Sequence, residues 1–246
     1  MAAFKIAKQK KLNFNSILYW SKNITKEEVS MRNKLKKDLK PDEIIHRFII
    51  PTYKEELKII VETCNNLLNS DWNKKKFAIT LGGEEWDKEN FEFVSSEIKK
   101  MFGDKFWFFD FTLHPRGLEW ELPGKWSNIS YSAKLQYQSI LDTFQTTPDK
   151  VLVTTLDADT NIEKQYPEIL SYYYVCADDR KNKSYQPIIF FFNNFWDAPF
   201  FSKIISLWNS FWILFNSLKK VWMRNFSTHA QPLDALIQTD FWSKET

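Results

Sequence analysis

Four short, mainly apolar runs alternate with helical patterns through the middle of this chain. The runs cover residues 46–51, 77–81, 106–113 and 151–156. After the first run, Leu57, Ile60, Cys64 and Leu67 recur at the spacing of an amphipathic helix. Strands that are apolar on both faces are typical of parallel sheets, because helices cover both sides of such a sheet. The sequence therefore predicts an α/β fold with a mostly parallel central sheet, and a ligand site beyond the carboxyl ends of its strands.

The first 44 residues differ in character from the rest of the chain. They are polar, with basic clusters over residues 5–11 and 32–40, and they end in a predicted linker at Lys40-Pro41-Asp42. We expect a basic N-terminal extension over residues 1–44 and the regular domain over residues 45–246. The basic clusters suit a solvated face or contact with anionic lipid head groups. The net charge is only +3 and no recognition motif is present, so we expect no nucleic-acid partner.

Cysteine usage and hydropathy bear on the compartment. The chain has two cysteines, Cys64 and Cys176, which we expect to be buried free thiols, and this favours a reducing, cytoplasmic setting. The N-terminus shows no secretory signal pattern. Residues 204–218 lack charge but contain several Ser and Asn. This segment is too short and polar for a membrane span and is predicted to be a buried or interfacial helix.

Two carboxylates follow the fourth apolar run directly. Asp157 and Asp159, separated by Ala158, are spaced so that their side chains can project to the same side of an exposed sheet edge. Mg²⁺ and Mn²⁺ prefer oxygen ligands and often take one or two carboxylates together with substrate phosphates. An isolated triplet of this kind is more often a solvated turn. Its position after a buried strand favours a metal and diphosphate site.

The first apolar run ends in Pro51-Thr52-Tyr53-Lys54-Glu55. A proline at a strand end, followed by a turn and a helix start, leaves backbone N–H groups and an aromatic face near the sheet edge, which suits a base and ribose. A structural role is equally open: Thr52 can cap the helix, with Glu55 completing a capping box.

A third segment, Gly124-Lys125-Trp126-Ser127-Asn128, opens the helix predicted before the fourth strand. Glycine followed by lysine at a helix start can hold a phosphate-bearing ligand. A phosphate-binding P-loop is excluded, because its first glycine would fall at Glu119 and its Ser or Thr at Trp126.

In their order and spacing, these three segments resemble the signature of inverting family 2 glycosyltransferases with the GT-A fold. The resemblance covers roughly residues 46–242. Later stretches around residues 185–187, 192–199 and 226–230 resemble a membrane-associated bacterial subgroup of that family. The resemblance implies transfer of a sugar from a nucleotide-diphosphate donor, such as a UDP-sugar, to an acceptor hydroxyl with inversion. It also implies a carbohydrate or lipid-linked acceptor, and a location at the inner face of the plasma membrane.

The resemblance also implies roles for particular residues. The donor pocket would include Pro51, Thr52, Tyr53, Glu55, Glu84, Glu85, Lys125, Asn128 and Asp157. Either Glu84 or Glu85 would stand near the base, while Asp157 and Asp159 would bind Mn²⁺ or Mg²⁺. Trp196 and His229 would lie on the acceptor side.

One part of the family pattern is missing. Inverting members place a general base, usually the Asp of a Glu-Asp pair, after a Gly-Phe-Trp-like segment, and the base deprotonates the acceptor hydroxyl. This sequence reads Thr239-Asp240-Phe241-Trp242 and reaches Thr246 without such a pair, and without the Gln-x-x-Arg-Trp motif of processive synthases. Asp240 is a weak substitute. We therefore expect the base, and membrane helices, to lie beyond Thr246.

Two alternatives stay open. The missing base suggests a domain that binds a nucleotide sugar without turnover. A nucleotidyltransferase shares a nucleotide-binding α/β sheet and a carboxylate-bound metal, but Pro51-Thr52-Tyr53 occupies the place of its usual glycine- and arginine-rich loop.

Overall fold

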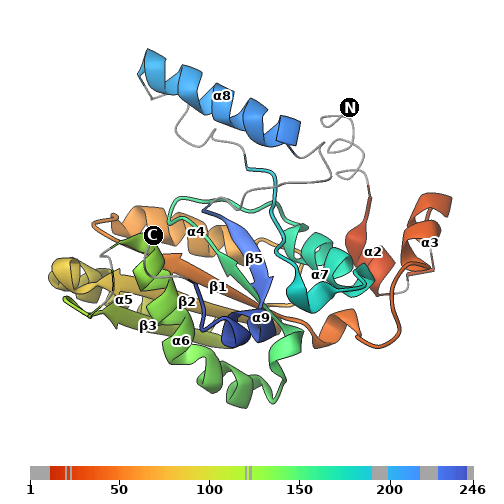
Figure 1. The fold of residues 1–246 in the computed structure, drawn as a ribbon, viewed down its shortest axis with the longest axis horizontal. Coiled ribbons are helices and arrows are strands. Elements are labelled where there is room, and N and C mark those ends of the chain that lie inside the picture. Colours follow the sequence, from red (N-terminus) through yellow and green to blue (C-terminus); the bar gives the residue numbers. More distant parts are fainter. Residues whose placement is uncertain are drawn as a thin grey trace.

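A central sheet organises the protein (Figure 1). The computed structural model describes residues 12–19, 21–22, 24–119, 121, 124–189, 199–216 and 227–242. Within them, five strands lie in the order β3-β2-β1-β4-β5. Their bounds are β1 Ile45–Pro51, β2 Phe77–Glu84, β3 Phe108–His114, β4 Val151–Thr155 and β5 His229–Pro232. The first four strands pair in parallel and β5 pairs antiparallel to β4, which confirms the predicted mostly parallel α/β sheet.

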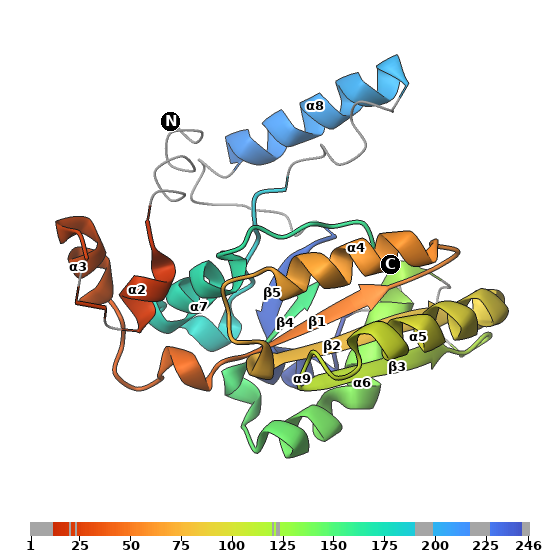
Figure 2. The ribbon, with the colours of Figure 1, turned by 180° about the vertical axis from the view of Figure 1, so that it is seen from behind.

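Helices cover both faces of the sheet. The long helix α6 (Lys125–Phe144) and the short α9 (Leu233–Gln238) pack on one face, whereas α4 (Leu57–Leu68) and α5 (Lys88–Phe102) cover the other (Figure 2). Alternate residues of β1 serve the two layers: Ile49 belongs to the α6 core, and Phe48 and Ile50 belong to the α4 and α5 core. All seven residues of β1 are buried, because the strand has neighbours on both edges and helices on both faces.

The other helices lie toward the ends of the chain or in connections. They are α2 (Phe14–Leu18), α3 (Lys26–Arg32), α7 (Tyr166–Cys176) and α8 (Phe200–Asn216). Short 3₁₀ turns occur at η1 (Pro41–Glu43), η2 (Lys74–Lys76), η3 (Glu85–Asp87), η4 (Pro148–Lys150) and η5 (Arg180–Asn182).

The second strand extends beyond its expected end. The sequence predicts a stop at Gly82-Gly83, but β2 continues through both glycines to Glu84. A Cβ at Gly82 would lie 2.6 Å from Ser132 Oγ on α6, and one at Gly83 would overlap the Phe91 ring on α5. The glycines therefore permit close helix packing on both faces of the strand, and they do not end it.

The described part of the N-terminal 44 residues packs against the sheet domain. The side chains of Phe14, Ile17 and Leu18 are buried in the same core as Phe48. The Phe14 ring contacts Tyr172 of α7 edge-on, with ring centroids 5.6 Å apart. The division at residue 44 marks a change in composition, and packing is continuous across it.

The apolar segment predicted over residues 204–218 forms most of α8. Its large side chains are mostly exposed, including Phe201 (77%) and Trp208 (68%). Of the two expected alternatives, a buried or an interfacial helix, the exposure rules out the buried one and leaves the interfacial one as a prediction. No helix among the described residues has the length and hydropathy of a membrane span.

Both cysteines are free thiols. Cys64 is buried in α4, as expected, whereas Cys176 at the end of α7 is only half-buried. Burial raises the pKa of the Cys64 thiol to about 12 and also raises the pKa of Cys176. Neither is a reactive thiolate at neutral pH.

Candidate functional site

A cavity of about 560 Å³ opens at the carboxyl ends of β1, β2 and β4. Its lining residues are Pro51, Thr52, Tyr53, Glu55, Glu84, Trp86, Gly124, Lys125, Asn128, Asp157 and Ala158. The structure thus brings together the three segments that the sequence singled out. The volume lies in the ordinary range for small-molecule sites.

The segment after β1 is tied to β2. The backbone N–H of Thr52 donates to the Gly82 carbonyl oxygen at 2.7 Å, and the Thr52 hydroxyl donates to the same oxygen at 3.2 Å. The proposed capping box is wrong, because α4 begins only at Leu57 and the Thr52 hydroxyl is directed to β2. The Glu55 carboxylate instead accepts a bond from the Tyr53 backbone N–H. The Tyr53 ring is half-exposed beside the cavity.

Lys125 at the start of α6 and Asp157 after β4 form a charged pair in the cavity wall. The Lys125 ammonium contacts Asp157 Oδ1, and the Ser227 hydroxyl donates to Asp157 Oδ2 at 2.6 Å. Burial lowers the pKa of Lys125 to about 8, although the charges of Asp159 and Glu55 oppose this shift. Burial raises the pKa of Glu55, and the neighbouring charges of Asp87 and Asp159 add to that rise.

The carboxylates of Asp157 and Asp159 fit a cation that arrives with phosphate groups. In the part of the chain that the structure describes, no three His, Cys, Asp or Glu side chains form a preformed metal cage. Asp157 lines the cavity, and the charge of Asp159 acts on both Lys125 and Glu55. Mg²⁺ often takes one or two carboxylates and completes its shell with water and substrate phosphates, so these two oxygen donors suit that mode.

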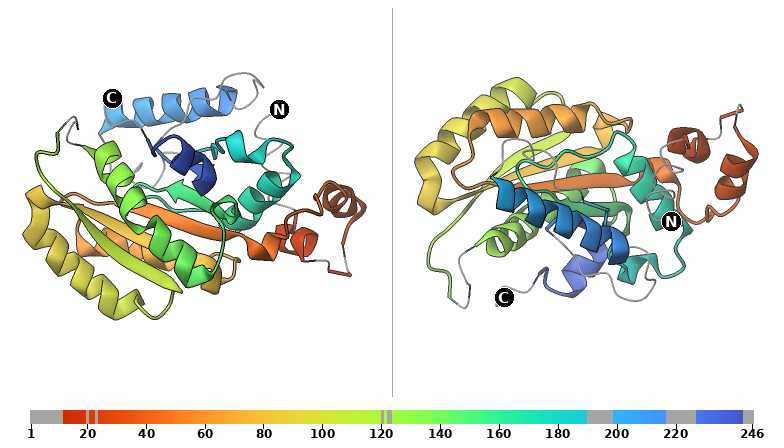
Figure 3. Two further views of the ribbon diagram at one scale, coloured as in Figure 1. Left: turned by 60° about the horizontal axis from the view of Figure 1, so that its bottom comes forward. Right: turned by 90° about the horizontal axis from the view of Figure 1, so that it is seen from above.

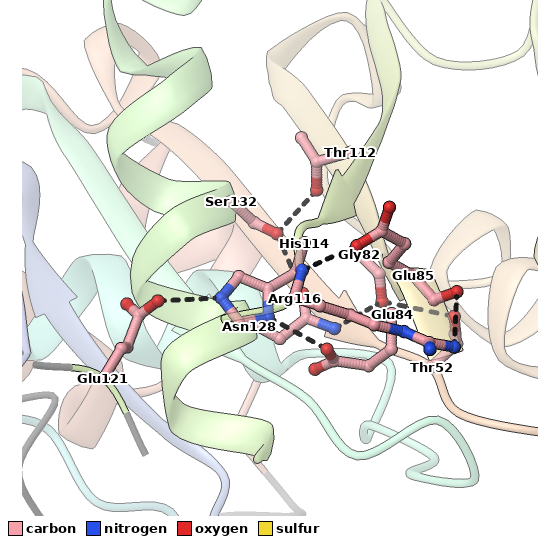
Figure 4. Close-up of polar contacts among 10 residues, drawn as sticks. All are labelled: Thr52, Gly82, Glu84, Glu85, Thr112, His114, Arg116, Glu121, Asn128 and Ser132. Carbon is pink, nitrogen blue, oxygen red and sulfur yellow. Dashed lines mark hydrogen bonds and ion pairs between the residues drawn. The ribbon is translucent and has the colours of Figure 1, made fainter. Parts of the chain in front are cut away.

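The two candidate acidic residues at the end of β2, Glu84 and Glu85, have different contacts (Figure 4). Glu84 is buried and lines the cavity, and its Oε2 lies 2.9 Å from Nδ1 of His114. Glu85 does not line the cavity; its carboxylate accepts the backbone N–H of Arg116 at 2.7 Å. Nε2 of His114 lies 3.0 Å from Glu121 Oε2 on the other side of the ring.

Asn128 forms part of the cavity wall but uses its amide within the protein. It is buried on α6, where its Nδ2 donates to the Gly82 carbonyl at 3.0 Å and its Oδ1 accepts from the Ser132 hydroxyl at 3.1 Å. Thr112 on β3 extends this network to Ser132 at 2.6 Å (Figure 4). The residue predicted to support the donor site therefore holds α6 against β2.

Of the two acceptor-side candidates, the structure describes only His229. His229 is buried on β5, with its ring centroid 5.8 Å from that of Trp126 and 6.0 Å from that of Trp242. It is not among the residues that line the cavity. Trp196 lies outside the described residues. Asp240 is also away from the lining, paired with Lys134 at 2.6 Å.

Three residues near the cavity are absent from the sequence-based expectation: Trp86, His114 and Glu121. His114 could have been found by the strand-end rule, because it directly follows the third apolar run. Trp86 could have been found in the same way, because it follows Glu84 and Glu85 after the second apolar run. No local pattern marks Glu121, whose contact with His114 depends on the path of the connection to α6.

Comparisons with known proteins establish the fold. No protein-family model matches the sequence, and no curated protein sequence is detectably similar to it. The structure is similar to a mannosyltransferase from Pyrobaculum calidifontis in complex with GDP-Man and Mn²⁺, with a TM-score of 0.51 and 16% identity over 89% of this chain and 54% of that one. This likeness supports the observed fold, a mostly parallel sheet flanked by helices, which the chain shares with that structure.

Weaker structural matches include residues 1–349 of S. aureus TarS, at 13% identity and a TM-score of 0.44 over 80% of this chain and 49% of that one. The same TarS fragment in complex with UDP-GlcNAc matches with a TM-score of 0.43 and 13% identity, over 82% of this chain and 51% of that one. The chain spans about half the length of these solved structures.

Proposed function

We propose that the chain binds a nucleotide-diphosphate sugar in the cavity and transfers its sugar to an acceptor hydroxyl with inversion. The observation that carries the proposal is the Lys125–Asp157 pair, placed at the carboxyl ends of parallel strands in a GT-A-like fold. A cation and an anion at one wall of a cavity suit a diphosphate and its counter-ion.

The base would lie between Tyr53 and Glu84. The half-exposed Tyr53 ring offers an aromatic face, and Trp86 adds a second aromatic side chain to the lining. The ionised Glu84 carboxylate can only accept hydrogen bonds, so it suits a base edge that donates an N–H, as uracil and guanine do. UDP-sugars and GDP-sugars are therefore the donors to test.

The diphosphate would meet Lys125. The ammonium group would exchange its contact with Asp157 for a phosphate oxygen, and the added negative charge would keep the lysine protonated despite its lowered pKa. Asp157 and Asp159 would hold Mn²⁺ or Mg²⁺. When bound, the cation would supply charge neutralisation to the diphosphate leaving group. The chain's own contribution is a fixed pair of carboxylates and a cationic lysine on a rigid helix start.

The acceptor side of the proposal rests on fewer residues. Trp196 and His229 stay predictions for it. A second candidate function is donor binding without transfer. It is favoured by the position of Asp240, the one base candidate within the sequence, which pairs with Lys134 away from the cavity. A nucleotidyltransferase has no specific observation in its favour.

We also propose that the exposed surface of α8 contacts a membrane. The exposed side chains of α8 are nearly all large and apolar, and Lys203 is its single charged residue. A helix with this composition suits the boundary between head groups and acyl chains. The acceptor would then be lipid-linked or membrane-proximal, and the enzyme would work at the inner face of the plasma membrane.

Calorimetry with UDP and GDP, each with and without Mn²⁺, tests donor binding. We expect metal-dependent binding of at least one nucleotide, and at least tenfold weaker binding by Asp159→Ala with an unchanged unfolding midpoint. Asp178→Ala is a matched control, because this exposed carboxylate pairs with Lys36 and does not line the cavity. Binding by Asp159→Ala that equals the parent's would overturn the metal assignment.

Transfer is tested separately by following release of UDP from UDP-sugars in the presence of simple sugar acceptors. Binding without release of UDP would favour the second candidate function. Absence of nucleotide binding under all conditions would reject both.

A further inference from the structure

A buried histidine beside the cavity lies between two carboxylates (Figure 4). His114, at the end of β3, has Nδ1 2.9 Å from Glu84 Oε2 and Nε2 3.0 Å from Glu121 Oε2. All three side chains are at most one-tenth exposed. The donor-binding role described above uses Glu84 and leaves the other two unexplained.

The two contacts define how many protons the cluster holds. A neutral imidazole has one N–H, and an ionised carboxylate has none, so a neutral ring between two ionised carboxylates would leave one contact without a proton. One more proton is needed. The imidazolium form supplies it and also offsets the repulsion between two carboxylates in a poorly solvated site.

The surroundings agree with this charge state. Burial alone would lower the pKa of His114, but the hydrogen bonds to Glu84 and Glu121 and their charges outweigh it, and the pKa is raised above 6.5. From α6, the Tyr131 ring lies with its centroid 5.3 Å from that of the imidazole. The nearby Arg116 is occupied elsewhere, with its guanidinium 4.3 Å above the Trp86 ring and its backbone N–H bonded to Glu85.

We propose that His114 is a positioning residue that holds the Glu84 carboxylate oriented at the cavity wall, and thereby makes nucleotide binding at this site dependent on pH. The inference rests on the proposed function, because it requires Glu84 to contact the base. Within the described part of the chain, Glu84 Oε1 accepts no hydrogen bond, so the second oxygen of the same carboxylate is the one offered to a ligand.

The direction of the effect follows from the shared proton. Below the raised pKa of His114, both imidazole N–H groups donate and the Glu84 carboxylate stays fixed. Above that pKa, the neutral imidazole has only one N–H to donate. Either Glu84 loses its hydrogen bond, or Glu121 loses its own and repels Glu84. Nucleotide affinity is therefore highest at the lower pH and falls as the pH rises through the pKa of His114.

The first measurement needs no nucleotide. The chain has three histidines, so the imidazole nitrogen and carbon shifts can be assigned by NMR with one variant each. We expect His114 to titrate above 6.5, while burial keeps His46 neutral with a pKa near 3. In Glu121→Gln, the midpoint for His114 should fall. A His114 that is neutral at pH 6.5 in the parent would overturn the proposal, even if nucleotides bind.

The second measurement is calorimetry with UDP and GDP plus Mn²⁺ between pH 6 and pH 9. One linked proton gives a loss of up to tenfold in affinity per pH unit above the pKa. Lys125 titrates near pH 8 and contributes to the profile of every variant. We expect His114→Gln to bind more weakly at pH 6.5 and to have a flatter profile than the parent. Glu121→Gln should bind normally at pH 6 and lose affinity at a lower pH than the parent.

Glu119→Gln is the matched control, because this carboxylate is exposed two residues before Glu121. It should reproduce the parent's profile. A parent and a His114→Gln variant with parallel pH profiles would reject the positioning role. If neither nucleotide binds at any pH, the proposed function fails as a whole, and the NMR titration still reports whether the imidazolium bridge exists.

Discussion

Among single residues, Glu168 stands out as a buried carboxyl group in the core. Its side chain in α7 has 0% exposure, and neither carboxylate oxygen accepts a hydrogen bond from another described residue. Burial, reinforced by the charge of Asp71, raises its pKa to about 7, with Lys74 opposing the shift. The residue lies outside the cavity lining, so its effect is expected on stability and not on ligand binding.

Because of Glu168, we expect the free energy of unfolding to fall as the pH rises. The unfolded state ionises this group near pH 4.5, whereas the folded state keeps it protonated until about pH 7. The folded state binds the extra proton between these values, so the penalty grows through that window to about 3 kcal/mol at pH 8.

Urea unfolding at pH 5 and pH 8 measures this effect. In Glu168→Gln, which cannot ionise, the difference in unfolding free energy between the two pH values should change in favour of pH 8 by about 2–3 kcal/mol relative to the parent, because a small part of the penalty is already present at pH 5. Equal pH dependence in the two proteins would show that Glu168 is ionised in the folded state.

At the scale of elements, the packing of α6 on β2 connects the fold to the site. Gly82 allows the helix to approach, and Asn128 closes the contact by donating to the Gly82 carbonyl. The same carbonyl receives the backbone and hydroxyl of Thr52, so one β2 peptide positions both neighbouring segments. Lys125 lies one helical turn before Asn128 and depends on the same contact.

Gly82→Ala tests this contact. The added methyl would overlap Asn128 Oδ1 and crowd Ser132, so we expect a loss of about 1–3 kcal/mol in unfolding free energy and weaker nucleotide binding. Asn128→Ala should also destabilise the protein, because it removes two buried hydrogen bonds.

The double variant supplies the control. Asn128→Ala removes the atom that the new methyl would strike, so the two losses should be less than additive. Strict additivity, measured by chemical denaturation, would mean that Gly82 is not required by the approach of α6.

At the scale of the whole molecule, α8 lies outside the layers formed by the sheet and its covering helices (Figure 3). Its apolar side chains recur along the helix, among them Phe201, Ile205, Trp208, Phe211 and Trp212. A contiguous apolar surface of this kind on a folded protein indicates contact with a membrane or another protein.

Vesicle co-sedimentation tests the membrane contact. We expect the full chain to bind vesicles that contain anionic lipid, and Trp208→Glu to lower this binding at least tenfold, because burial of a large apolar side chain contributes about 2 kcal/mol. Phe93→Glu on α5 is the matched control, since this ring is also exposed but lies on another helix. Unchanged binding by Trp208→Glu, or self-association of the parent that this change abolishes, would assign α8 to a different partner.

The sequence alone determined the layers of the protein and the edge where its site lies. Hydrophobic periodicity is a local property, so the four parallel strands and the helices between them could be predicted, with ends displaced by a few residues. The strand-end rule then placed Tyr53 and Asp157 near one another. The N-terminal segment was harder, because its few apolar residues, such as Phe14, lie in a polar and basic stretch.

Only the tertiary structure decided which side chains use the cavity and which support it. Glu84 and Glu85 are adjacent and chemically identical, but Glu84 ends β2 and Glu85 begins η3, and only Glu84 meets His114. Asn128 resembles a ligand contact in sequence, but its amide is taken up by Gly82 and Ser132. These outcomes depend on strand register and on contacts between residues far apart in the chain. Such contacts leave no periodic signal, which is why neither the pairing of Lys125 with Asp157 nor the histidine bridge could be expected from the sequence.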